Sequence, residues 1–80
     1  MAKDNHSKML AKRLAAIACK MNHDIRYMHK DIYAQDEKLL DFAAEIATDM
    51  GFEVHIIWRR DGQIEAVTVG KEREEVLCGD

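Results

Sequence analysis

The chain has 80 residues, of which 48% are hydrophobic and 34% are charged, and its formal net charge is −3. This composition is typical of one soluble folded domain and excludes a disordered chain. No apolar run approaches the roughly 20 residues that cross a bilayer, and residues 1–9 lack the apolar segment of a secretory signal. We therefore expect a single cytoplasmic domain over residues 1–80, with no membrane contact.

An apolar stripe in the first part of the chain predicts a long helix. Its members recur at steps of three and four residues, which places them on one helix face: Leu10, Leu14, Ile17, Met21, Ile25, Met28 and Ile32. Asp4 or Asn5 is a suitable N-cap, and neither Pro nor Gly occurs in residues 1–50. We predict one helix from this cap to Tyr33. A break at Asn22–Asp24 is the alternative, because Asn and Asp are only moderate helix formers.

A second helix is predicted from Asp36, a suitable N-cap, to Met50. Gly51 supplies the left-handed residue that commonly ends a helix. The helix carries acidic residues at every fourth position, called here the acidic row: Glu37, Asp41, Glu45 and Asp49. Like charges at this spacing repel one another, so we expect them to be offset by Lys20 or Arg26 of the first helix, by a basic partner surface, or by divalent cations.

Alternating polarity after Gly51 predicts two strands joined in a hairpin at Asp61–Gly62. The predicted register is Arg59–Ile64, Ile57–Ala66, Ile56–Val67 and Val54–Val69. It places on the core face Val54, Ile56, Trp58, Val67 and Val69. It places on the opposite face, which is unusually apolar, His55, Ile57, Ile64, Ala66 and Thr68. We expect residues 71–80, which are highly charged, and residues 1–4 to be flexible.

These elements predict an α+β fold with a long N-terminal helix, a shorter second helix and a C-terminal β-hairpin. A second helix of about fourteen residues covers only the C-terminal half of a helix of about thirty. Each large apolar side chain left exposed forfeits about 1.5–3 kcal/mol, and an isolated two-stranded sheet is marginal. We therefore predict that oligomerisation, most simply as a homodimer, completes the fold through an interface of Leu10, Leu14, Ile17 and Met21.

The charge is distributed unevenly along the chain. Residues 1–30 hold seven Lys/Arg and two Asp/Glu, whereas residues 31–80 hold five and thirteen. The simpler interpretation is that the acidic second half neutralises the basic first half in the folded chain. Binding of nucleic acid is the alternative, through Lys8, Lys12, Arg13, Lys20 and Arg26.

No arrangement of residues indicates catalysis or cofactor binding. Ser7 is the only serine and lies in no nucleophile motif, and the four glycines form no phosphate-binding loop. His23 and His29 lie about 240° apart around a continuous helix, so we expect their rings to diverge and predict no metal site. Cys19 and Cys78 fall short of a disulfide framework and are interpreted as free thiols.

We therefore expect a small non-catalytic interaction or regulatory protein, of the kind common among bacterial and phage products. It acts as a homo-oligomer and binds a protein partner. The expected partner surfaces are the acidic row and, on the hairpin, His55, Ile57, Arg59, Arg60 and Ile64, since Arg is enriched at binding hot spots. Besides nucleic-acid binding, a nucleotide or metabolite site between subunits remains an alternative, including an enzymatic one, because such a site leaves no linear motif.

Overall fold

The computed structural model describes residues 2–77. Two helices, α1 (Ala2–Arg26) and α2 (Lys30–Asp49), precede three strands, β1 (Val54–Trp58), β2 (Ile64–Val69) and β3 (Glu72–Glu75). The strands form one antiparallel sheet in the order β1-β2-β3. The predicted α+β class and the order of helices before strands are confirmed, and β3 extends the predicted hairpin.

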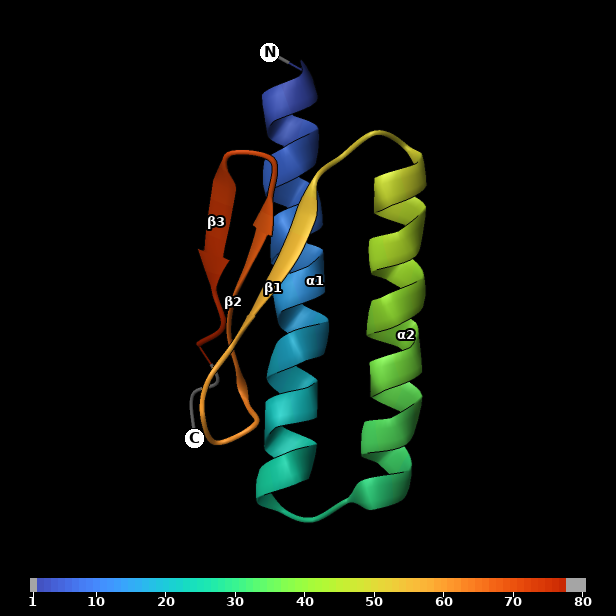
Figure 1. Cartoon of the computed structure of the whole chain (residues 1–80), viewed down its shortest axis with the longest axis vertical. Coiled ribbons are helices and arrows are strands. Elements are labelled where there is room, and N and C mark those ends of the chain that lie inside the picture. The colour runs from blue at the N-terminus through green and yellow to red at the C-terminus, as the bar shows by residue number, and fades with distance from the viewer. Residues whose placement is uncertain (1, 78–80) are drawn as a thin grey trace.

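Helix α1 is the central element of the fold. It packs against the sheet on one side and against α2 on the other, while α2 makes few contacts with β1 (Figure 1). Alanines at three core positions of α1 allow close approach of neighbouring elements. The core consists of Ala11, Leu14, Ala15, Ala18, Met21, Leu40, Ile64, Val67, Val69 and Val76.

The helices are separated by a tight turn at Tyr27–His29, so the prediction of one helix to Tyr33 is wrong, as is the alternative break at Asn22–Asp24. The His29 N–H donates to the Asp24 carbonyl at 2.8 Å and the Met28 N–H to the Ile25 carbonyl at 3.2 Å. These two hydrogen bonds define a Schellman motif, with Met28 at φ 61° in the left-handed position.

Because α2 begins at Lys30 rather than Asp36, it is long enough to lie along most of α1. Leu14 and Met21 are 2% and 1% exposed, and Leu10 and Ile17 pack against the same core. The four residues predicted to form an oligomer interface thus contribute to the core of a single chain. An uncovered helix front was the physical reason for placing an interface there, and the chain itself covers it.

We predict that Met28→Gly raises the free energy of unfolding by about 1 kcal/mol. Glycine adopts a positive φ without the steric cost that a side chain imposes, and the Met28 side chain is 73% exposed and loses little packing. Met28→Ile should lower stability, since a β-branched residue is strongly disfavoured there. Urea denaturation measures both changes, and a glycine variant less stable than wild type would contradict the prediction.

The sheet keeps the predicted register except near the turn. The pairs Val54–Val69, Ile56–Val67 and Ile57–Ala66 are confirmed, but a bulge then places Ile64 opposite Trp58 instead of Arg59. Ile64 consequently turns into the core and is 1% exposed, whereas Trp58 is 50% exposed. The predictions of a core Trp58 and a solvent-facing Ile64 are therefore wrong. Ala66, also expected on the outer face, is fully buried.

Asn22 joins the sheet to α1 at this bulge. Its side-chain Nδ2 donates to the Ile64 carbonyl at 2.9 Å, and the Ile64 N–H donates to its Oδ1 at 2.8 Å. The Asn22 amide thus pairs with both backbone groups of Ile64 as a neighbouring strand would. Asn22 is 3% exposed, so water does not compete for these hydrogen bonds.

Residues 72–75, expected to belong to a flexible segment, form the edge strand β3. Its sequence is charged throughout and shows no apolar alternation, which explains why it was not predicted. The strand pairs with β2, and Arg73 forms ion pairs with Glu65 and Glu75. Residues 78–80, part of the same expectation, lie outside the described residues.

Cys19, on α1, is disulfide-bonded, so the interpretation of this residue as a free thiol is wrong. Cys78, for which the same interpretation was made, lies outside the described residues. Disulfide formation in a chain with only two cysteines has no local sequence motif, and a count of cysteines alone therefore did not reveal it.

Candidate functional site

The outer side of α2 carries large apolar side chains that are exposed to solvent. Helical spacing places them within about 80° of one another, beside the face that packs on α1. Their exposed fractions range from 42% to 66%. These residues, called here the α2 stripe, are Ile32, Leu39, Phe42, Ile46 and Met50. No other element lies on the side of α2 away from α1 (Figure 1).

The amino-acid sequence contains a pattern that predicts the α2 stripe, in addition to the face of α2 that packs on α1. Apolar residues occur in adjacent pairs along α2, at 39–40, 42–43 and 46–47. One member of each pair points toward α1 and the other lies exposed. An apolar arc this wide exceeds what one neighbouring helix covers.

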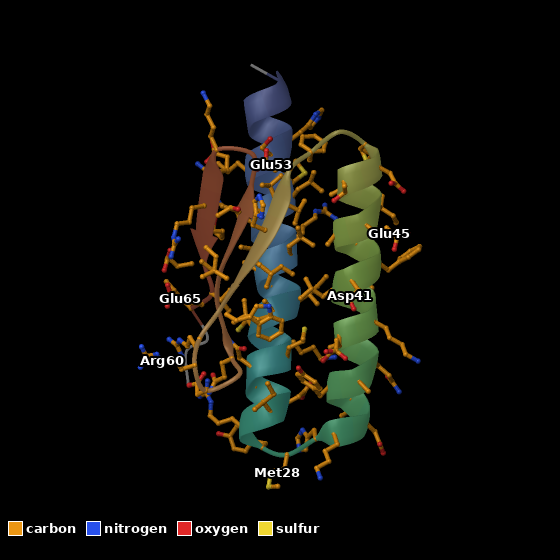
Figure 2. All side chains as sticks on the ribbon, in the orientation of Figure 1. Met28, Asp41, Glu45, Glu53, Arg60 and Glu65 are labelled. Carbon is orange, nitrogen blue, oxygen red and sulfur yellow. The ribbon has the colours of Figure 1, made fainter. Side chains whose placement is uncertain are left out.

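The four carboxylates of the acidic row are all exposed. Figure 2 labels two of them, Asp41 and Glu45, on α2. Among the residues that the structure describes, none of the four forms an ion pair. The predicted neutralisation by Lys20 is not seen, because its Nζ lies 3.4 Å from Oδ1 of Asp36 instead.

The hairpin residues proposed from the sequence do not form one surface. Ile64 is buried, Ile57 is half-buried, and only His55, Arg59 and Arg60 are exposed. The His55 Nε2 lies 2.8 Å from Oε2 of Glu53. Arg60 extends from the turn away from the sheet, whereas Glu53 is at the far end of β1 (Figure 2).

The basic residues of α1 are exposed as well: Lys8, Lys12, Arg13, Lys20 and Arg26. Strand β3, which carries Glu72, Glu74 and Glu75, packs against α1. A phosphate backbone that approached α1 from this side would meet acidic side chains, which weakens electrostatic attraction. The acidic strand beside the basic helix agrees with the simpler interpretation of the uneven charge.

The turn between the helices gathers four titratable groups. His23 and Asp24 come from the last turn of α1, His29 from the turn itself and Asp36 from α2. The Asp24 Oδ1 lies 3.7 Å from Nδ1 of His23 and 3.5 Å from Nδ1 of His29. The expectation that the two rings diverge is wrong, because the chain reverses at Met28 and brings the ring centroids to 6.2 Å.

Asp24 and Asp36 are buried carboxyl groups, 3% and 5% exposed, and each has an Oδ2 atom without a hydrogen-bond partner. Burial raises the pKa of Asp36, and the neighbouring Asp24 raises it further. The neighbouring side chain of Asp36 lowers the pKa of Asp24. Two neighbouring carboxyl groups resist ionising together, which is why the pKa of Asp36 moves up while that of Asp24 moves down.

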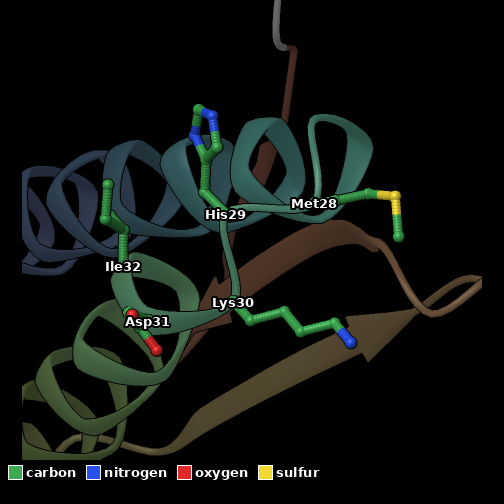
Figure 3. A pocket seen from close by; sticks show the side chains of 5 residues that line it. All are labelled: Met28, His29, Lys30, Asp31 and Ile32. Atoms are coloured by element: carbon green, nitrogen blue, oxygen red, sulfur yellow. The ribbon is translucent and has the colours of Figure 1, made fainter.

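The outer surface of this turn is an open hollow of about 470 Å³ lined by Met28, His29, Lys30, Asp31 and Ile32 (Figure 3). The side chains of His29 and Lys30 point in opposite directions there. The two side chains therefore do not converge on one point of the hollow. The acidic and histidine side chains described above define the candidate site instead.

Comparison with known protein families, curated proteins and solved structures finds no match to the chain. Function is therefore argued from the α2 stripe and the helix–helix turn alone. Neither helix, within residues 2–77, has the length and apolar character that crossing a bilayer requires.

Proposed function

We propose that this is a non-catalytic interaction protein that associates with a second copy of itself through the α2 stripe. The observation that supports this proposal is a row of five large apolar side chains exposed on α2, a helix that packs mainly on α1 and makes few contacts with β1. Contiguous apolar surface of this kind commonly marks a protein-binding site. A second copy offers the same stripe, so the two surfaces are complementary in polarity.

An antiparallel arrangement of the two α2 helices fits the distribution of side chains. With the twofold axis at Phe42, Leu39 of one copy faces Ile46 of the other. Lys38 then lies near Glu45 of the second copy, which adds an attraction between opposite charges.

Association through the α2 stripe leaves other surfaces of each copy accessible. Glu37 and Asp41, in the acidic row, are on a different side of α2 from the stripe. A basic protein surface is the partner that these unpaired carboxylates would attract. The proposed role is thus a homodimer that presents two acidic helix faces to a partner protein.

We expect Phe42→Glu to weaken self-association on the order of 100-fold, because it places a charge at the centre of an apolar interface. Sedimentation equilibrium should give twice the chain mass of 9.2 kDa for the wild type and the single mass for the variant. Leu77→Glu is the matched control, since Leu77 is 84% exposed and lies outside the stripe. Circular dichroism checks that both variants fold.

The arrangement itself is tested by exchanging charges. Lys38→Glu should weaken the dimer, Glu45→Lys should do the same, and the double variant should recover much of the loss. A wild-type chain that stays monomeric at all concentrations, or a Phe42→Glu chain that remains dimeric, would overturn the proposal. If the double variant did not recover the lost dimer affinity, the antiparallel arrangement would be rejected.

A further inference from the structure

We propose that the turn between α1 and α2 binds a late first-row divalent metal ion, with zinc as the reference ion, through His23, Asp24 and His29. One ligand atom from each of these residues lies within 4.8 Å of the others. This assignment is independent of self-association, because none of the three residues belongs to the α2 stripe.

Two of the three separations between ligand atoms are close to those of a tetrahedral site, and the two histidine nitrogens lie within 4.8 Å of each other. The separations of 3.5 and 3.7 Å between Asp24 Oδ1 and the two histidine Nδ1 atoms exceed the roughly 2.7–3.2 Å of a direct hydrogen bond. Ligands at about 2.0–2.1 Å from a tetrahedral zinc ion are about 3.3–3.5 Å apart. An ion therefore fits between these atoms after small rotations of the side chains.

The burial of Asp24 is the second, independent observation. Asp24 is 3% exposed, and among the described residues its Oδ2 atom has no hydrogen-bond donor within reach. A metal ion held by its carboxylate supplies the missing positive charge. Asp36, whose Oδ2 is also unpartnered, lies behind Asp24 and can orient the liganding carboxylate.

The donor set selects the class of ion. Two imidazoles and one carboxylate suit zinc and neighbouring transition metals, whereas magnesium and calcium prefer oxygen ligands alone. The histidine side chains are 56% and 49% exposed, so an ion can enter from solvent. With three protein ligands, the fourth coordination position is left for water.

The fold holds the ligands in place before an ion arrives. His23 and Asp24 are adjacent in the last turn of α1, and the His29 N–H is bonded to the Asp24 carbonyl at 2.8 Å. The ring of Tyr27 packs 4.6 Å from that of His23, centroid to centroid. An ion would therefore fasten the end of α1 to the turn that leads into α2.

Calorimetric titration of the chelator-treated full chain with zinc chloride is the test. We expect one ion per chain, a higher melting temperature with zinc, and an affinity loss on the order of 100-fold in His29→Ala. His55→Ala is the matched control, because His55 is an exposed histidine beside a carboxylate, Glu53, without a second histidine. In NMR spectra, zinc should shift the imidazole resonances of His23 and His29 and leave those of His55 unchanged.

Three outcomes would overturn the proposal: no saturable zinc binding, equal zinc affinity in the His23→Ala/His29→Ala double variant, or equal affinity for magnesium. The double variant retains both cysteines and both buried carboxyl groups, so binding that persists in it comes from elsewhere. Because both histidines are about half exposed, these variants should fold, and circular dichroism checks this. Phe42→Glu should bind zinc as the wild type does, which separates this proposal from self-association.

Discussion

Asn22→Ala is expected to lower the free energy of unfolding by about 3 kcal/mol. The substitution removes two buried hydrogen bonds and leaves the N–H and carbonyl of Ile64 without partners. Unpaired buried polar groups cost about 1–3 kcal/mol each, partly recovered if water enters the space. In a chain of 80 residues, this is a large share of the total stability.

Urea denaturation followed by circular dichroism measures this change. Gln35→Ala is the matched control, since it removes the same type of amide from an exposed position on a helix, and should change stability by less than about 0.5 kcal/mol. Equal stability of the Asn22 and Gln35 variants would show that the amide does not hold β2 to α1.

Met21→Ala is expected to lower the free energy of unfolding by about 2–4 kcal/mol, because it leaves a cavity among well-packed neighbours. Met21 is 1% exposed and among the largest fully buried side chains. Met9→Ala, on the same helix at 50% exposure, should cost less than about 0.5 kcal/mol.

Concentration dependence distinguishes the core position of Met21 from the oligomer interface expected from the sequence. A core residue destabilises the variant equally at every protein concentration. If the loss of stability instead shrank as the protein was concentrated, Met21 would lie between copies. Thermal melts at several concentrations, with Met9→Ala alongside, provide this measurement.

The two helix ends show what the sequence could and could not reveal. The end of α2 was predicted because Gly51, at φ 95°, occupies the left-handed position of a Schellman motif. Its N–H donates to the Thr48 carbonyl, and that of Phe52 donates to the Ala47 carbonyl. The end of α1 uses the same pair of hydrogen bonds, but with Met28 in place of glycine. A methionine does not indicate a left-handed residue as a glycine does. The three- and four-residue spacing of apolar residues also continues across the turn, so nothing in the sequence marks the end of α1 there.

The expectation that His23 and His29 diverge was wrong because the turn at Met28 was not predicted. On a continuous helix His23 and His29 diverge, and only a reversal at Met28 brings them to the same carboxylate. The error in the predicted strand register near the hairpin turn has another cause. The Asp61–Gly62 turn is local and was identified, whereas the bulge depends on Asn22, 42 residues from Ile64 in the sequence. Local patterns do not reveal partners that are so distant along the chain.

The central position of α1 also determines how the chain can fold. Strands β2 and β3 pack on α1, so the core forms only when the first and last parts of the chain meet. Helix α2 lies within the loop that this meeting closes, and it holds few contacts with the sheet. Closing such a long loop is entropically slow relative to local contacts. The hairpin of α1 and α2, joined by a short turn, is therefore the local unit that can form early, while the sheet completes the structure last.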